Sequence, residues 1–372
     1  MIPNVKKYFI IAGEPSGDLH GSKLIMAIKS IDPNTSFMGH GGNNMKKAGL
    51  QLIEDIDKLS IMGFFEVIKH LPRFKKILSN TVEIIKHSKP DRVILIDYPG
   101  FNLRLAKKIA HFNIPITYFI LPQAWAWKEN RVNIIKKFID QSISIFPFEK
   151  EWYKSKNLQV DYLGHPFMDL EHVNETSKSF YNRHSLKINY PILTLLPGSR
   201  QQEIDKHWPV FLETVRLIKK KVKDIQIIIG KSSNITIPNC PEDFRIEKNA
   251  RKAIIAGTVA LVSSGTTNLE CAIEDTPIVV CYKLNLSSWI LAKLLVKIKF
   301  SSIVNIIAGK LIVQEFLQNK MKPKALSKEI INLLNVESKK HQNMINEFKK
   351  IKKLLGSPGV YNRIAELILN KT

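Results

Sequence analysis

Apolar runs of five residues recur in the first third of the chain, and each leads into a polar or glycine-rich block. The runs cover residues 8–12, 92–96 and 116–120. After the first run, Leu24 and Ile28 belong to a stretch with helical spacing of apolar residues. Continuous apolar runs are typical of strands buried on both faces of a parallel sheet. The alternation with helical stretches therefore predicts βα units of such a sheet.

The same pattern returns later in the chain, after a polar interruption. Largely apolar stretches cover residues 192–196, 224–229 and 260–262, whereas residues 169–189 are polar and show no strand pattern. At 372 residues the chain is long enough for two domains of ordinary size. We therefore predict an α/β protein whose two parallel-sheet domains, residues 1–168 and 190–340, face one cleft. Residues 169–189 form the linker, and the helical pattern of residues 341–372 predicts helices that pack back on the first domain.

Composition indicates a folded chain with an unusual charge. Hydrophobic residues make up 44% and charged residues 24% of the sequence, which is typical of globular proteins. The formal net charge is +23, which favours an anionic partner such as nucleic acid, a membrane surface or a phosphorylated substrate. Lys, Ile and Asn are abundant throughout, so a general compositional bias is an equally good explanation of this charge.

Cysteine usage and the N-terminal residues favour a reducing compartment. Cys240, Cys271 and Cys281 are widely spaced and contain no C-x-x-C pair, so the sequence predicts neither a disulfide framework nor a zinc site. No signal-like segment precedes the first strand, and no apolar stretch is as long as a membrane span. We expect a cytoplasmic protein that is soluble or peripheral to a membrane.

The loop after the first strand suits a sugar better than a phosphate. It contains Gly13, Glu14, Ser16, Gly17 and Asp18. A glycine-rich loop at a helix start offers free N–H groups, but Glu14 and Asp18 would repel an anion. The alternative is a tight turn whose Asp caps the following helix.

Asp97 is the candidate general base of the first domain. It follows the apolar run 92–96, so its carboxyl lies at the carboxyl end of a central strand. Apolar surroundings raise the pKa of a carboxyl and fit it for accepting a proton near neutral pH. A structural Asp that caps the next helix is the alternative.

Two loops of the second domain are suited to a diphosphate. One carries Gly198, Ser199 and Arg200, which combine a glycine turn, a hydroxyl and a permanent positive charge. The other runs through Ser264, Gly265, Thr266 and Thr267 at a helix start, and Glu270 follows one helical turn later, where it can accept hydrogen bonds from ribose hydroxyls. No metal-binding or P-loop motif is present, so we predict neither a metal nor a cofactor.

One basic, aromatic stretch is a candidate membrane contact. Its apolar side chains recur at helical spacing among Lys, Arg and His: Phe64, Val67, Ile68, Leu71 and Phe74. Such a stretch is typical of an interfacial helix. An ordinary core helix with a solvated lysine face is the alternative.

The short blocks together resemble the lipid-A-disaccharide synthase family. They keep the family's order from about residue 8 to 320: residues 12–18 (AGEPSGD), 97–102 (DYPGFN), 123–127 (QAWAW), 146–149 (FPFE), 164–166 (GHP), 196–200 (LPGSR), 264–266 (SGT) with 269–270 (LE), and 305–309 (NIIAG). Two departures concern the uridine contact: Val304 stands where the family usually has proline, and Lys310-Leu311 stand where an acidic residue is expected.

The resemblance implies an inverting glycosyltransferase of family 19 with the GT-B architecture of two Rossmann-like domains. Such a hexosyltransferase joins UDP-2,3-diacylglucosamine to 2,3-diacylglucosamine 1-phosphate through a β-1,6 link and releases UDP. It would act at the cytoplasmic face of the inner membrane of a Gram-negative bacterium, without nucleic acid. A homodimer is the expected assembly.

The resemblance also assigns roles to residues. Asp97 is the base for the acceptor hydroxyl, Arg200, residues 264–267, Glu270 and Asn305 hold UDP, and the first-domain loop with Asn102, Gln123 and Trp125 lies on the acceptor side. Another GT-B enzyme, such as a peptidoglycan N-acetylglucosaminyltransferase, or a UDP-sugar epimerase would share the second-domain loops. A non-catalytic basic binder of membranes or nucleic acid would explain the charge but not Asp97 and Arg200.

Overall fold

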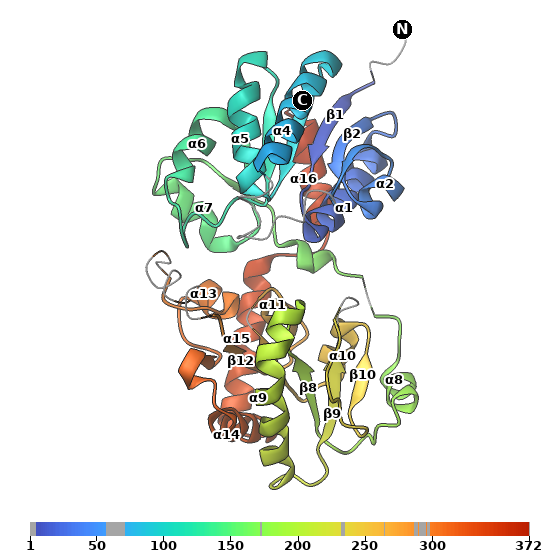
Figure 1. Ribbon diagram of the computed structural model, residues 1–372, viewed down its shortest axis with the longest axis vertical. Coiled ribbons are helices and arrows are strands. Elements are labelled where there is room, and N and C mark those ends of the chain that lie inside the picture. Colours follow the sequence, from blue (N-terminus) through green and yellow to red (C-terminus); the bar gives the residue numbers. More distant parts are fainter. Residues whose placement is uncertain are drawn as a thin grey trace. The chain divides into compact units, whose positions relative to one another are not determined.

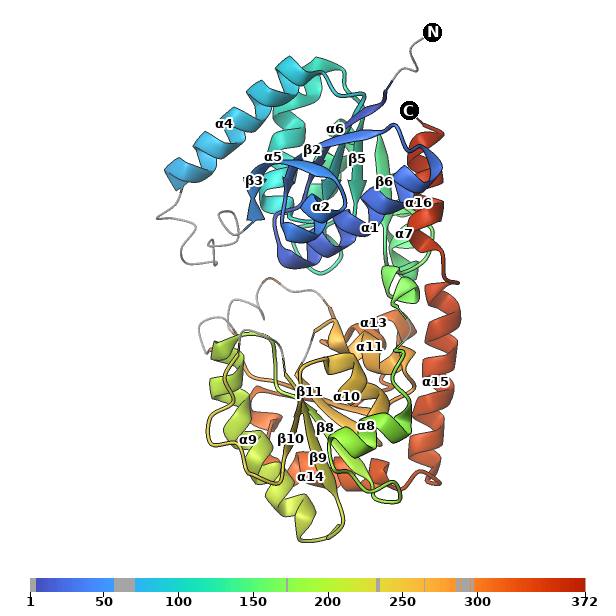
Figure 2. The ribbon, with the colours of Figure 1, turned by 90° about the vertical axis from the view of Figure 1, so that its right-hand side faces the viewer.

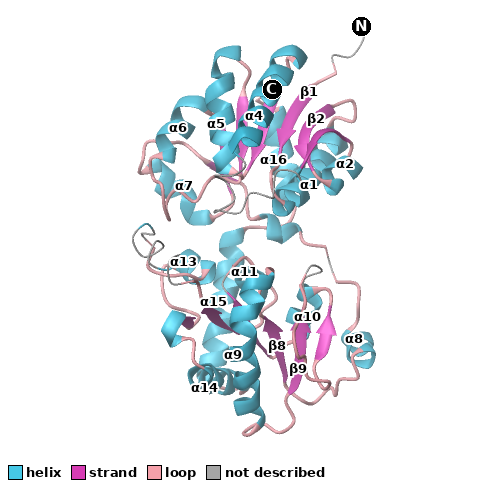
Figure 3. Ribbon diagram, in the orientation of Figure 1, coloured by secondary structure: helices cyan, strands magenta, loops and turns pink. Residues whose placement is uncertain are grey.

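The chain forms two compact units in the computed structural model, which describes residues 5–56, 71–171, 173–231, 235–263, 265–285, 289, 295 and 298–371. Unit 1 comprises Met1–Leu170 and Leu355–Thr372, and unit 2 comprises Glu171–Leu354 (Figure 1). In each unit helices cover a sheet in which all described strand pairs are parallel (Figure 3). The predicted fold class, two Rossmann-like α/β domains, is confirmed.

Unit 1 contains a sheet with the order β3-β2-β1-β4-β5-β6-β7. Its strands are β1 (Lys7–Ile11), β2 (Ser36–Gly41), β3 (Leu50–Asp55), β4 (Arg92–Ile96), β5 (Ile116–Phe119), β6 (Gln141–Ser144) and β7 (Asp161–Tyr162). Its helices are α1 (Pro15–Ile31), α2 (Asn43–Lys47), α4 (Leu71–Ser88), α5 (Pro99–Ile109), η1 (Ala110–Phe112), α6 (Arg131–Phe138), α7 (Pro147–Lys154), η2 (Pro166–Asp169) and α16 (Val360–Leu369). The direction of strand order reverses between β1 and β4, which is where open α/β sheets bind their ligands.

Two apolar layers cover the sheet of unit 1. Alternate residues of β1 point to opposite faces, so Phe9 packs with α4, α5 and α6, whereas Ile10 packs with α1, α2 and α16. Figure 2 shows α4 on the face of the sheet away from α1 and α2. Full burial of both faces explains why the central strands β1, β4 and β5 are largely apolar.

Unit 2 contains a sheet with the order β10-β9-β8-β11-β12-β13. Its strands are β8 (Ile192–Leu196), β9 (Gln226–Gly230), β10 (Arg245–Glu247), β11 (Val259–Ser263), β12 (Ile278–Tyr282) and β13 (Glu315–Leu317). Its helices are α8 (Ser177–Arg183), α9 (Gln201–Lys219), α10 (Ala250–Ala256), α11 (Thr267–Ile273), α13 (Ile303–Ala308), η3 (Gln318–Lys320), α14 (Pro323–Leu334) and α15 (Lys339–Leu355). Here the order reverses between β8 and β11, so the loops after these strands form the second expected ligand edge.

The C-terminal helix belongs to unit 1. Val360, Ile364 and Ile368 of α16 are buried against the first sheet. The Tyr361 hydroxyl lies 2.7 Å from Nδ1 of His20 on α1. The crossover therefore supplies part of the core of unit 1.

The domain boundaries differ from the sequence prediction at two places. Residues 169–189 were expected to be a linker, but α8 lies within them and Phe180 packs in the core of unit 2. Residues 341–372 were expected to pack on the first domain as a whole, but α15 lies in unit 2 up to Leu354 and only α16 lies in unit 1. Apolar residues at helical spacing predict a buried face and do not reveal which sheet buries it. Among the described residues, no helix is long and apolar enough to cross a membrane.

Candidate functional site

The ligand edge of unit 1 is built around the end of β4. Asp97 and Tyr98 follow this strand with φ values of +45° and +49°. Two such residues in succession are costly for side chains with a Cβ and persist only where the surroundings hold them. The carbonyl oxygen of Asp97 accepts hydrogen bonds from the Tyr118 hydroxyl at 2.6 Å and from Nδ2 of Asn102 at 2.7 Å. The turn that presents Asp97 is therefore fixed by the strand beside it and the helix after it.

The environment of Asp97 prepares its carboxyl for proton transfer. Burial raises the pKa of this carboxyl to about 6, and the nearby negative charge of Glu14 adds to the effect. A hydrogen bond from the Tyr98 backbone and the positive charge of Arg131 act in the opposite direction. Asp97 can therefore take up a proton near neutral pH, as a general base must.

Gly13 leaves room for the ring of Tyr98. A Cβ at position 13 would lie 2.2 Å from Cδ1 of Tyr98. The loop after β1 and the turn after β4 thus touch at a point where no side chain fits between them. Glycine at 13 is needed for this close approach.

A buried carboxyl that sequence reasoning did not select lies in the same unit. Glu149 on α7 is 1% exposed, and its Oε1 accepts a hydrogen bond from the Trp125 indole at 2.9 Å. Burial raises the pKa of Glu149 to about 7 in spite of this bond. The block of residues 146–149 (FPFE) could have indicated this buried carboxyl, because a glutamate among apolar residues is rarely buried without a partner. Glu149 fixes Trp125, which was expected on the acceptor side.

Arg131 is a second residue that the sequence did not single out. Its guanidinium lies 4.9 Å from the ring centroid of Trp127, and its charge acts on Asp97. Arg131 is the first residue of α6. It places a positive charge at the edge that carries the candidate base.

Three predicted contacts on the acceptor side have structural roles instead. Asp18 is 3% exposed, and its carboxylate accepts hydrogen bonds from the backbone N–H groups of Gly42, Asn44 and Met45 at 2.7–3.0 Å. It caps α2, and not the helix after its own loop as the alternative had it, because Asp18 itself lies within that helix, α1. Asn102 is fully buried and holds the turn at Asp97, and Gly17 is buried against Ala12. Glu14, Ser16 and Gln123 are exposed, so they remain predicted acceptor contacts.

The residues predicted to bind UDP in unit 2 follow the ends of β8 and β11. Gly198, Ser199 and Arg200 follow β8, and Arg200 is exposed at the N-cap of α9. Within the part of the chain that the structure describes, its guanidinium makes no hydrogen bond or ion pair. Gly265 and Thr266 are exposed before α11, and Thr267 begins that helix. Ser264 lies outside the described residues. The free cation and exposed polar groups at this edge suit an anionic ligand.

Two further UDP contacts were predicted, and they differ in burial. Glu270 is partly exposed on α11, and burial raises the pKa of its carboxyl. Asn305 is fully buried: its Nδ2 donates to Val313 O at 2.9 Å and to Glu315 Oε1 at 2.8 Å, and its Oδ1 accepts from two backbone N–H groups. Both ends of the Asn305 amide are therefore hydrogen-bonded within the protein. The side chain holds the loop after α13, and its contact with UDP stays a prediction.

Phe74, one of the residues predicted to contact a membrane, lies in the core of unit 1. Phe74 on α4 is 8% exposed and packs in the core with Phe101. It forms part of the core rather than an interfacial face, because the apolar side of α4 covers the sheet. Phe64, Val67, Ile68 and the side chain of Leu71 lie outside the described residues.

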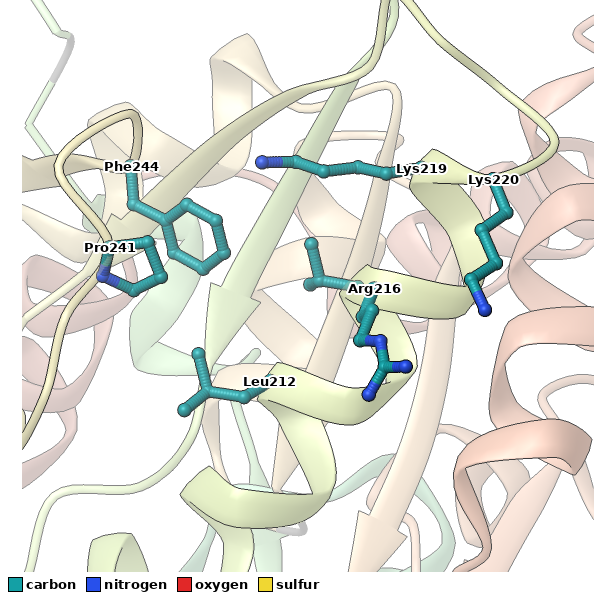
Figure 4. Close-up of a pocket in the computed structure, with 7 residues that line it drawn as sticks. Leu212, Arg216, Lys219, Lys220, Pro241 and Phe244 are labelled. Atoms are coloured by element: carbon teal, nitrogen blue, oxygen red, sulfur yellow. The ribbon is translucent and has the colours of Figure 1, made fainter.

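A hollow elsewhere on unit 2 contains none of the predicted site residues. It lies beside the C-terminal half of α9, whereas the Gly198–Arg200 loop precedes the first turn of that helix. Figure 4 shows its lining, formed by Leu212, Val215, Arg216, Lys219, Lys220, Pro241 and Phe244. Lys219 pairs with Asp243 and lies over the Phe244 ring.

Comparison with solved structures shows the fold at low sequence identity. The chain is similar to S. aureus MnaA in complex with UDP, with a TM-score of 0.67, 12% identity and coverage of 99% of this chain and 98% of the other. It is similar to CalG4, the calicheamicin glycosyltransferase, with a TM-score of 0.65, 11% identity and 99% coverage of both. It is also similar to a UDP-GlcNAc 2-epimerase from Methanocaldococcus jannaschii, with a TM-score of 0.63, 13% identity and coverage of 98% of this chain and 99% of the other. Epimerases and glycosyltransferases share this fold, so the fold alone does not separate these classes.

Sequence comparison separates them. A family model described as lipid-A-disaccharide synthetase matches residues 8–365. The lipid-A-disaccharide synthase of Myxococcus xanthus is 32% identical over 98% of this chain and 97% of its own length. Lipid-A-disaccharide synthase 1 of Legionella pneumophila is 34% identical over 96% of this chain and 95% of its own length. The chain therefore belongs to the lipid-A-disaccharide synthase family, a family of glycosyltransferase enzymes.

Proposed function

We propose that the protein joins UDP-2,3-diacylglucosamine to 2,3-diacylglucosamine 1-phosphate, giving the β-1,6-linked lipid A disaccharide 1-phosphate and UDP. Membership of the family supports glycosyl transfer in lipid A synthesis. The observation that carries the catalytic part is the Asp97 carboxyl, which a constrained turn presents at the ligand edge of unit 1 with a pKa raised to about 6.

In this proposal Asp97 removes the proton from the 6-hydroxyl of the acceptor. The oxygen forms a bond to C1 of the donor sugar while the bond from C1 to the UDP oxygen breaks, and UDP leaves with the electron pair. Attack from the opposite side inverts the anomeric centre. Exposed Glu14, Ser16 and Gln123 and the fixed ring of Trp125 are the proposed acceptor contacts.

The leaving diphosphate requires stabilisation of the charge that develops on it. Arg200 is the proposed main contact, with help from Ser199 and residues 264–267, because a guanidinium can pair with two phosphate oxygens at once. Glu270 is the proposed partner of the ribose hydroxyls. UDP is therefore assigned to unit 2 and the acceptor to unit 1.

Both proposed substrates carry acyl chains, so we propose peripheral association with the cytoplasmic face of the inner membrane. The net charge of +23 favours an anionic lipid surface. The segment of residues 64–71 is the proposed apolar contact, without Phe74. A homodimer remains part of the proposal.

The experiment is a transfer reaction with purified protein and both acylated sugars, followed by mass spectrometry of the products. We expect the disaccharide 1-phosphate only with the acylated donor, and UDP-N-acetylglucosamine serves as the control donor. Equal use of UDP-N-acetylglucosamine, or its conversion into an epimer without an acceptor, would contradict the proposal. The second outcome would favour the epimerase alternative.

A further inference from the structure

We propose that Glu203 and His207, one turn apart on α9, are positioning residues that clamp the loop of residues 197–200 to the end of β12 and thereby set the affinity for a nucleoside diphosphate. This inference rests on the proposed function, which assigns the diphosphate of the donor to that loop. It adds two residues that no motif in the sequence singled out.

Glu203 holds the loop through both carboxylate oxygens. Oε2 accepts a hydrogen bond from the Ser199 backbone N–H at 3.1 Å, and Oε1 accepts one from the Tyr282 hydroxyl at 2.9 Å. The carboxylate packs directly on Gly198, where a Cβ would lie 2.5 Å from Oε2 and where φ is +134°. Glycine at 198 is therefore needed both for the turn and for the approach of Glu203.

His207 makes a second connection between the same segments. It is fully buried, its Nε2 accepts a hydrogen bond from the Lys283 backbone N–H at 3.1 Å, and its Nδ1 lies 2.9 Å from Pro197 O. A backbone N–H can only donate and a carbonyl oxygen can only accept, so the proton resides on Nδ1. The geometry thus requires the neutral imidazole.

The clamp joins loops that the sheet does not bring together. In the strand order β8 and β12 are separated by β11, and the loop after β11 carries residues 264–267. Glu203 and His207 connect the loop after β8 to the end of β12, and these two segments flank the loop after β11. The connections therefore hold the loops at this end of the sheet in one arrangement. A preformed loop loses less conformational freedom when it binds an anion, which favours affinity.

Acid should weaken the clamp. Burial lowers the pKa of His207, and so does the charge of Lys206, while Pro197 O and the charge of Glu203 act in the opposite direction. The rings of Tyr282 and Phe211 flank the imidazole. A proton on Nε2 would face the Lys283 N–H. The hydrogen bond between His207 and Lys283 must therefore break when His207 is charged.

The test measures UDP binding by calorimetry. For Glu203→Ala and for Tyr282→Phe we expect the Kd for UDP to rise about tenfold, as expected for loss of one to two hydrogen bonds. Glu203→Gln should bind nearly as wild type, because its amide can accept from Ser199 and donate to the Tyr282 oxygen. Glu213→Ala, an exposed change on the same helix, is the control. Loss of folded protein would lower the binding stoichiometry and leave the Kd of the remainder unchanged.

The pH dependence provides an independent measurement. Because the pKa of His207 is lowered from 6.5, the affinity of wild type should fall more than that of His207→Gln as the pH is decreased below 6.5. The amide oxygen of the variant can accept from Lys283 without titrating. Comparison of the two proteins cancels the titration of UDP itself. If wild type binds UDP and Glu203→Ala binds it equally well or more tightly, the clamp is refuted and the proposed function stands. If wild type does not bind UDP, the proposed function fails first.

Discussion

The carboxyl of Asp97 owes its proposed role to its surroundings, since an exposed aspartate is ionised and weakly basic at neutral pH. We expect Asp97→Asn to lower the rate of transfer by about 10²–10⁴-fold, the usual contribution of a general base. The affinity for UDP should change little, because UDP is assigned to unit 2. Asp91→Asn, at the opposite end of β4, is the control. A loss below tenfold would move the role to Glu14 or His20.

The pH profile of the same reaction follows from the raised pKa. The base acts when it is deprotonated, so kcat/KM should decrease by about tenfold per pH unit below pH 6. Initial rates in a series of buffers measure this profile. A flat profile down to pH 5 would contradict a base with this pKa.

Glu149 should make stability depend on pH with the opposite sign to an ordinary carboxyl. Its pKa in the folded protein is raised from 4.5 to about 7 by burial, so the folded state holds a proton that the unfolded state has released. The free energy of unfolding should therefore decrease as pH rises from about 4.5 to 7. In thermal melts, the deficit of Glu149→Gln relative to wild type should be larger at pH 5 than at pH 8. Glu151→Gln, exposed on the same helix, should show no such change.

Arg200 should affect both binding and turnover. Arg200→Ala removes a charged contact whose partner gains negative charge as the sugar departs, so kcat/KM for the donor should fall by roughly ten- to a hundredfold. Arg200→Lys should recover little of this loss, since an ammonium lacks the planar paired donors. Activity should persist in excess EDTA, and a strict requirement for added magnesium would refute the role of Arg200 as the main counter-charge.

At the scale of elements, two glycines near the candidate base provide a matched pair. Gly13→Ala would place a Cβ 2.2 Å from the Tyr98 ring, whereas nothing lies within 4 Å of a Cβ at Gly100 in the first turn of α5. We expect Gly13→Ala to lower both the melting temperature and kcat, because Tyr98 must move and Asp97 with it. Gly100→Ala should be neutral or stabilise the protein by about 0.5–1 kcal/mol. Equal activity of the two variants would show that the turn tolerates movement.

The sequence predicted strands better than it predicted the partners of side chains. Residues 92–96 and 192–196 were delimited as the structure has them, because fully buried parallel strands are continuous apolar runs. Asp97 and Arg200 could be placed at strand ends for the same reason. The roles of Asp18 and Asn305 depend on backbone N–H groups of distant or folded-back segments, which no periodicity records. Likewise, the sequence showed the helical spacing of apolar residues at Phe74, but it did not show that this side chain packs against the first sheet.

For the whole molecule, the C-terminal segment should be more important to unit 1 than its length implies. Removal of α16 would expose the sheet face covered by Val360, Ile364 and Ile368. We expect a chain ending at Ser357 to lose transfer activity and to unfold at lower temperature in its first unit, with UDP binding retained. Calorimetry of unfolding and of UDP binding on one sample measures both. A single, unchanged unfolding transition with full activity would contradict this expectation.

The interrupted chain path of unit 1 also has a consequence for biosynthesis. Unit 2 is one continuous segment, Glu171–Leu354, while unit 1 is completed only by Leu355–Thr372. On the ribosome, the last residue of unit 2 is therefore synthesised before the last residue of unit 1. At about 5–20 residues per second the delay is roughly one to four seconds. Until then the first sheet lacks α16, and its apolar face is open to chaperones and proteases. We infer that the second unit reaches its native state first, the reverse of the order in which ribosomes usually deliver folded domains.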